Sequence, residues 1–101
     1  MSKNILEYNF IQQLQMLPFV DEIWLFGSRA RGDNTEQADI DLAIICPTAN
    51  NRNWDSIMEI IDQADTLLKI DCIRFDKQQI SPELYHNILN EKQVIYAKNQ
   101  N

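Results

Sequence analysis

Apolar residues recur at helical spacing near the start of the chain and define its first predicted element. The residues that share this spacing are Leu6, Phe10, Leu14 and Leu17. They predict an amphipathic helix over residues 4–17 with one inward stripe. Pro18 fixes its own φ and has no N–H to donate, so we expect the helix to end there.

Four shorter apolar runs are typical of β-strands. They cover residues 23–26, 39–46, 67–75 and 94–96. Their length and apolar content favour strands over helices. The last run is short, and we expect it to dock as a closing strand.

Two further helices are predicted where a polar capping residue precedes apolar residues at helical spacing. Asn53 is the candidate N-cap of a helix that continues to about residue 64, and Ser81 with Pro82 opens the last helix. The inward positions are Trp54, Ile57, Met58 and Ile61 in the first of these helices and Leu84, Tyr85, Ile88 and Leu89 in the second.

The order of these elements implies an α/β or α+β domain of two layers. Helices should cover one face of the sheet, and the other face should carry Asp39, Asp41 and Asp71. The chain has 101 residues, which is enough for one domain over residues 1–101.

Charge and cysteine content narrow the possible partners and compartment. The net charge of −6 makes the chain a poor non-specific binder of nucleic acid and suits a basic protein partner better. Cys46 and Cys72 lie in apolar runs, so we expect free thiols in a reducing cytoplasm. No signal peptide is recognisable, and no apolar run approaches the ~20 residues of a membrane span.

Two carboxylates interrupt the apolar run 39–46. Asp39 and Asp41 are one residue apart, so on a strand they point to the same face with Cα atoms roughly 6.5–7 Å apart. Such a pair is costly unless charge or water compensates it. Two hard oxygen ligands on one rigid face suit Mg²⁺.

The residues that follow the strand at 23–26 can supply the other half of a site. Gly27 allows the backbone to approach a ligand closely, and we expect Ser28 to cap a short helix over residues 29–31. Free N–H groups at a helix start bind anions such as phosphate. By itself this Gly-Ser pair is equally consistent with an ordinary capped turn. Arg29 and Arg31 are candidate phosphate contacts or solvated helix residues.

Gly27-Ser28, ten intervening residues and then Asp39-Ile40-Asp41 resemble the signature of the DNA polymerase β-like nucleotidyltransferases. The length of the chain and the run Gly-Ser-Arg-Ala-Arg-Gly-Asp are similar to the smallest branch, the minimal nucleotidyltransferases. One departure is Ala38, since members often carry serine at that position.

The resemblance implies a fold, a metal site and a substrate. It implies the polymerase β-like fold, with a mixed sheet, and a third metal-binding carboxylate from the next strand, for which Asp71 is the acidic residue available. It implies that Asp39, Asp41 and Asp71 hold two Mg²⁺ ions and that Gly27 and Ser28 contact the phosphates of ATP. Lys69 lies two residues before Asp71 and can either touch a phosphate or balance charge.

The resemblance also implies a partner. Minimal nucleotidyltransferases commonly pair with a HEPN-domain ribonuclease and act as antitoxins that transfer AMP from ATP to a tyrosine of that toxin. Two alternatives remain open. One is a small-molecule nucleotidyltransferase, for example acting on an aminoglycoside, and the other is a non-catalytic antitoxin that acts by binding alone.

Overall fold

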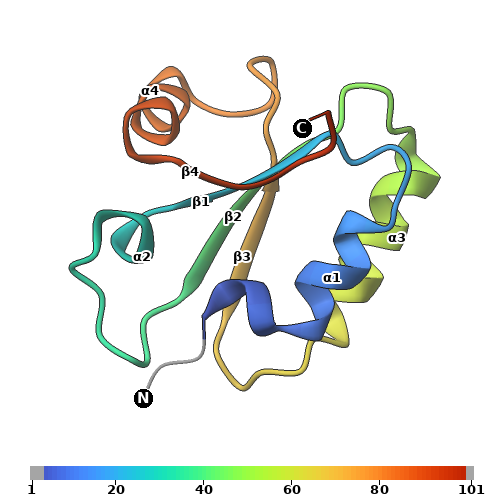
Figure 1. The fold of residues 1–101 in the computed structure, drawn as a ribbon. Helices are drawn as coiled ribbons and strands as arrows, with labels where there is room; N and C mark the ends of the chain where they lie inside the picture. Colours follow the sequence, from blue (N-terminus) through green and yellow to red (C-terminus); the bar gives the residue numbers. More distant parts are fainter. Residues whose placement is uncertain (1–3, 100–101) are drawn as a thin grey trace.

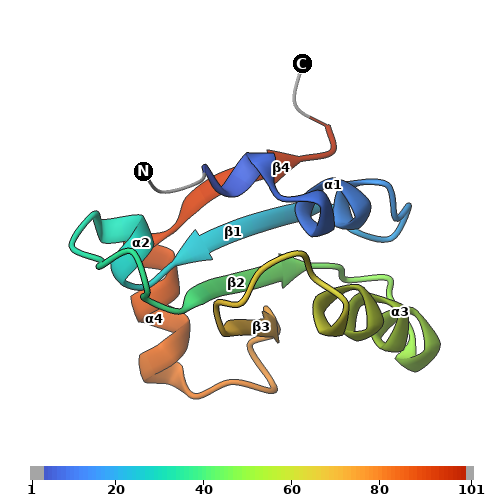
Figure 2. The same cartoon turned by 90° about the horizontal axis from the view of Figure 1, so that it is seen from below.

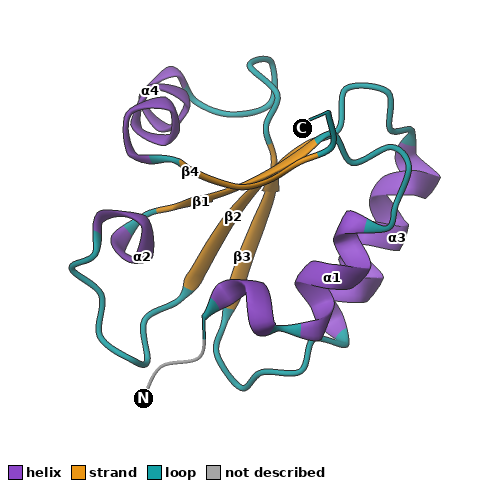
Figure 3. Ribbon diagram, in the orientation of Figure 1, coloured by secondary structure: helices purple, strands orange, loops and turns teal. Residues whose placement is uncertain are grey.

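The structure is a computed structural model that describes residues 4–99, in which a four-stranded sheet carries short helices (Figures 1 and 3). In chain order the elements are η1 (Ile5–Glu7), α1 (Asn9–Gln15), β1 (Glu22–Phe26), α2 (Ser28–Arg31), β2 (Ile40–Ile45), α3 (Asn51–Asp62), β3 (Ile70–Arg74), α4 (Pro82–Glu91) and β4 (Gln93–Ala97). No helix among these is long and apolar enough to span a bilayer.

The sheet is mixed and has the strand order β3-β2-β1-β4. The strand β2 pairs antiparallel with β1 and parallel with β3, and β4 closes the other edge antiparallel to β1. The register places Asp41 opposite Phe26 on one side and opposite Asp71 on the other. The predicted α+β class, the mixed sheet and the closing strand are confirmed.

The two faces of the sheet carry two separate apolar clusters. The helices α1 and α3 lie on one face, where they cover the alternating residues Ile23, Leu42 and Ile44 of the two central strands (Figures 1 and 2). On the other face Ile88 of α4 packs against Trp24 and Ala43. The expectation of helices on one face therefore holds for α1 and α3 and is wrong for α4.

The predicted first helix is divided in two. Tyr8 adopts an extended conformation (φ −73°, ψ 135°), which ends η1 and precedes α1. The carboxylate of Asp65 accepts hydrogen bonds from the N–H groups of Asn9 and Phe10, at 3.2 and 3.4 Å, and so caps α1 from a distant loop. As a result Leu6 lies on the separate first turn and is 46% exposed, not inward.

The other helix boundaries show how local capping decides where a helix begins. The N-cap of α3 is Asn50, and the side chain of Asn53 accepts from the N–H of Asn50 in a reciprocal capping box. The prediction of Asn53 as the cap is thus wrong by three residues. Ser81 caps α4 as predicted, with the N–H of Leu84 donating to its hydroxyl. Leu89, predicted to point inward, is 38% exposed.

Candidate active site

The predicted carboxylates gather where β2 and β3 begin. Asp41 is the second residue of β2 and Asp71 is the second residue of β3, and the two are direct partners in the parallel ladder. Asp39 lies just before β2, two residues from Asp41. Asp41 is half-buried, the side chain of Asp71 is 46% exposed, and Asp39 is exposed. The register of the sheet, which local sequence does not specify, therefore brings Asp71 beside Asp41.

Burial and neighbouring carboxylates both act on the protonation of Asp41. Burial raises the pKa of the Asp41 carboxyl above its ordinary value of 3.8, and the charges of Asp71 and Asp39 raise it further. A hydrogen bond with Asp71 acts in the same direction, and the charge of Arg31 opposes it in part. Asp41 thus takes up a proton, or accepts a cation, more readily than an isolated aspartate.

The donor set suits a hard divalent cation, although three ligands do not converge on one point. Among residues 4–99, no group of three His, Cys, Asp or Glu side chains lies close enough to hold one ion. Electrostatic interactions reach further than metal coordination. The charge of Asp39 therefore raises the pKa of Asp41, although Asp39 does not complete a three-ligand group with Asp41 and Asp71. Mg²⁺ typically binds one or two protein carboxylates and completes its shell with water and substrate phosphate. The adjacent Asp41 and Asp71 meet that requirement.

Gly27, the residue after β1, lies directly against the Asp41 carboxylate. Its φ of 75° lies in the region that favours glycine, and a Cβ at this position would collide with Oδ2 of Asp41 and lie 3.1 Å from its Cγ. Any other residue would push the turn away from the carboxylate. Gly27 is therefore the residue that brings the α2 turn to the site.

The α2 turn also corrects the role predicted for Ser28. The N-cap is Gly27, and Ser28 is the first helical residue with no side-chain capping bond. The carbonyl of Gly27 accepts from the N–H groups of Ala30 and Arg31, each at 3.1 Å. The hydroxyl of Ser28 is consequently not used as a helix cap.

Arg29 fixes the loop that leads to Asp39. Its Nη2 donates to the carbonyl oxygens of Ala38 and Glu36 at 2.8 and 3.0 Å, and its Nε donates to those of Ala38 and Asp39 at 3.2 and 3.3 Å. These hydrogen bonds join the Arg29 side chain to backbone carbonyls, so they hold the loop whatever side chains the loop residues carry. Arg29 thus determines where Asp39 enters the site.

Arg31 joins α2 to the end of α4 through a residue that the sequence did not single out. Its Nη1 donates to Oε1 of Glu91 at 3.1 Å, and its Nε donates to Asp33 at 3.1 Å. The other oxygen of Glu91 accepts from the N–H of Gly27 at 3.1 Å. Glu91 lies 60 residues from Arg31, so no local pattern could have identified it.

Lys69 contributes charge at the opposite side of the carboxylates. Its Nζ lies 3.7 Å from Oδ1 of Asp71, and its side chain is 70% exposed. The ion pair favours the charge-balancing interpretation of Lys69 over a built contact. An exposed pair of this kind contributes at most about 1 kcal/mol to stability.

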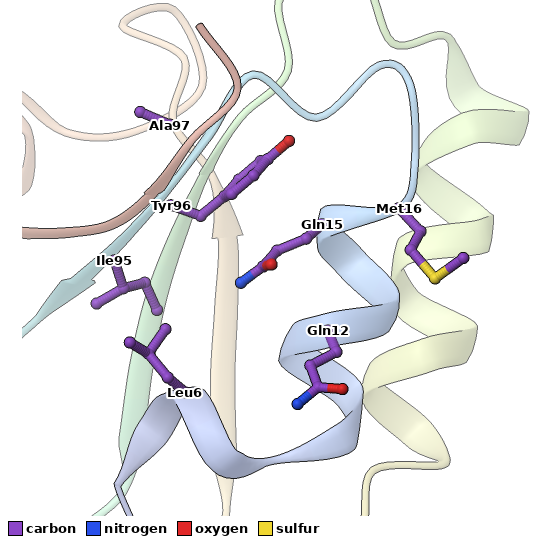
Figure 4. Close-up of a pocket in the computed structure, with 7 residues that line it drawn as sticks. All are labelled: Leu6, Gln12, Gln15, Met16, Ile95, Tyr96 and Ala97. Carbon is purple, nitrogen blue, oxygen red and sulfur yellow. The ribbon is translucent and has the colours of Figure 1, made fainter. Parts of the chain in front are cut away.

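A groove lies apart from the carboxylates, on another part of the molecule. A groove of about 950 Å³ lies between the N-terminal helices and β4 (Figure 4). Its lining residues are Leu6, Gln12, Gln15, Met16, Ile95, Tyr96 and Ala97. None of the three aspartates or the Gly-Ser turn contributes to it. This groove is therefore separate from the candidate site.

Sequence comparison places the chain in a family. The family model described as "Polymerase beta, Nucleotidyltransferase" matches residues 9–101. A Methanocaldococcus jannaschii protein named as a protein adenylyltransferase is 38% identical over 79 residues, which are 77% of this chain and 77% of that protein. These matches confirm the resemblance that the Gly-Ser and Asp-Ile-Asp motifs suggested.

Structural comparison gives the same fold. A toxin–antitoxin complex with AMP-PNP matches with a TM-score of 0.61 and 22% identity, over 91% of this chain and 74% of the other. A Sulfolobus solfataricus nucleotidyltransferase structure matches with a TM-score of 0.57 and 18% identity, over 90% and 77%. A structure of the MntA-HpeT toxin–antitoxin matches with a TM-score of 0.61 and 24% identity, over 91% and 73%. At these identities the likeness concerns the fold.

Proposed function

This chain belongs to the polymerase beta nucleotidyltransferase family and is a nucleotidyltransferase. From that premise we propose that it is a cytoplasmic antitoxin that transfers AMP from ATP to a tyrosine of a HEPN-family ribonuclease. The observation that carries the proposal is the Gly27 turn held against the paired Asp41 and Asp71. It supports the proposal because it brings the backbone of a glycine turn beside carboxylates that attract a cation.

The reaction fits the residues at this edge of the sheet. The tyrosine oxygen attacks the α-phosphorus of ATP, the bond between the α- and β-phosphates breaks, and diphosphate leaves. The phenolic proton passes to a carboxylate, a role that we assign to Asp71, the partner of Asp41 on the adjacent strand. Asp41, with its raised pKa, can take the same role.

The remaining predicted site residues bind and orient the nucleotide. Asp41 and Asp71 would hold Mg²⁺, as one or two ions, and Asp39 would add negative charge beside them. The bound metal would neutralise charge on the phosphates. The hydroxyl of Ser28, which caps no helix, and the backbone of Gly27 contact the terminal phosphates. Arg31 adds positive charge there. Arg29 contributes through the loop that it fixes and through its own charge.

Relatives and neighbours support the protein substrate. The M. jannaschii relative carries the name protein adenylyltransferase, and two structural neighbours are toxin–antitoxin structures, one of them with AMP-PNP. The net charge of −6 suits a basic partner protein.

Intact mass spectrometry tests the proposal. A purified candidate HEPN toxin is incubated with this protein, Mg²⁺ and ATP, and its mass is measured before and after. We expect an increase by one or more AMP units, located on tyrosine by peptide mapping. The same incubation with Asp41→Asn is the control and should leave the mass unchanged.

The two alternative functions predict different results. Loss of ribonuclease activity without added mass would support an antitoxin that acts by binding. AMP transfer to an aminoglycoside, with no transfer to protein, would support a small-molecule nucleotidyltransferase. Either result would overturn the proposal of protein adenylylation.

A further inference from the structure

Glu91 occupies two hydrogen-bond donors of the α2 turn, one at its N-cap and one on its last residue. One carboxylate oxygen accepts from the N–H of Gly27, and the other accepts from Nη1 of Arg31, both at 3.1 Å. The side chain of Glu91 is only 25% exposed, so the carboxylate is held between these two groups. In the proposed function, the backbone of Gly27 and the guanidinium of Arg31 are the groups that meet the terminal phosphates of ATP.

The surroundings of Glu91 disfavour a negative charge on its side chain. Glu91 is the last residue of α4, where the partial negative charge of the helix end disfavours a carboxylate. The neighbouring carboxylate of Asp41 lies against the same Gly27 residue and adds further negative charge. The contact with Gly27 and Arg31 offsets part of these costs.

A bound triphosphate would need the same space and the same donors. A carboxylate and a phosphate oxygen both accept charge-assisted hydrogen bonds from N–H groups. Both cannot use one backbone N–H at full strength, and their like charges repel at short range. Arg31, moreover, is already paired with Glu91 and Asp33.

We propose that Glu91 is an affinity-determining residue that competes with the terminal phosphates of the nucleotide for Gly27 and Arg31. This inference rests on the proposed nucleotide site. Binding of a nucleoside triphosphate displaces the Glu91 carboxylate from both donors. Glu91 therefore weakens triphosphate binding selectively and has no effect on a ligand that lacks phosphates.

Isothermal titration calorimetry with a non-hydrolysable ATP analogue tests the competition. Glu91→Gln keeps the shape and an acceptor oxygen but removes the charge, so the bond to the Gly27 N–H becomes weaker. We expect the variant to bind the analogue about threefold to tenfold more tightly than the unmodified chain in Mg²⁺ buffer. Adenosine should bind both proteins with the same affinity.

A matched control lies on the same helix. Glu83→Gln makes the same change of charge in the first turn of α4, where the side chain is exposed. It should leave the affinity for the analogue unchanged. If Glu91→Gln does not fold, as judged by circular dichroism, Glu91→Asp replaces it, because a side chain shorter by one methylene cannot reach both donors.

The outcomes separate this inference from the proposed function. If the unmodified chain binds no analogue, the proposed nucleotide site is wrong. If it binds the analogue but Glu91→Gln binds it equally or less tightly, the site stands and the competition is overturned. Equal tightening by Glu83→Gln would also overturn it, because the effect would then be one of net charge.

Discussion

Replacing Asp41 by asparagine should stabilise the folded chain at neutral pH while it abolishes transfer. Asp41 and Asp71 are partners on adjacent strands, which lie ~4.8 Å apart. Two unit charges at that distance repel by about 0.9 kcal/mol in water and about 3.5 kcal/mol at an effective dielectric constant of 20. Because Asp41 is half-buried and Asp71 is 46% exposed, we expect the lower end, about 1 kcal/mol of added stability.

The stability gained by Asp41→Asn should depend on pH in a defined direction. The pKa of Asp41 is raised in the folded state, so the folded chain binds more protons than the unfolded chain between the ordinary value of 3.8 and the raised value. The free energy of unfolding contributed by Asp41 therefore falls as the pH rises through that interval. Asparagine does not titrate. The added stability of Asp41→Asn is therefore complete above the raised pKa of Asp41 and disappears below 3.8.

Urea denaturation at a series of pH values, in the presence of a chelator, measures this effect. With a slope of about 1 kcal/mol/M for a chain of this size, the midpoint of Asp41→Asn should be higher by about 1 M at pH 7.5. Asp55→Asn, an exposed position in α3, makes the same change of net charge and should shift the midpoint little. Equal or lower stability of Asp41→Asn at pH 7.5 would refute the repulsion between the carboxylates.

Three further substitutions and a metal titration test other parts of the site. Ser28→Ala should weaken binding of an ATP analogue, measured by calorimetry, yet change stability by less than about 0.5 kcal/mol, because Ser28 caps no helix. Gly27→Ala should destabilise the fold by about 1–3 kcal/mol in urea, since it combines a positive φ with a collision at Asp41. Arg29→Ala should speed amide hydrogen exchange in residues 36–39, and unchanged exchange would contradict its role in the loop. Mg²⁺ at ten times its Kd should stabilise the unmodified chain by about 1.4 kcal/mol and leave Asp41→Asn unaffected; an equal effect on both would place the ion elsewhere.

Residues that act through local geometry were predictable from the sequence. Asp41 alternates with the buried Ile40 and Leu42 because of the two-residue period of a strand, and the turn after β1 needs a glycine because of its φ. Ser81 with Pro82 marks the start of α4 because both act within one helical turn. These features need no information from the rest of the chain.

Features that depend on distant contacts were not predictable. The break at Tyr8 is stabilised by Asp65, whose carboxylate caps α1 from 55 and 56 residues away. The face covered by α4 depends on Ile88 meeting Trp24, which no periodicity within the helix can specify. In each case the decisive partner is set by the topology of the sheet and not by the local pattern.

The same distinction explains why the site is more acidic than its motif suggests. The motif contributes Asp39 and Asp41, but the strand register adds Asp71 and the packing of α4 adds Glu91. Among the described residues these four carboxylates outnumber the cations paired with them, since Lys69 pairs with Asp71 and Arg31 is divided between Glu91 and Asp33. Such an excess of negative charge costs stability in the absence of a cation and would be relieved when a cation enters with a nucleotide. A site of this kind therefore gains most when metal and triphosphate bind together, so the affinity of each should rise in the presence of the other. Calorimetric titration of the ATP analogue with and without Mg²⁺ measures this coupling, and equal affinities would show that the carboxylates and the Gly27 turn act as independent sites.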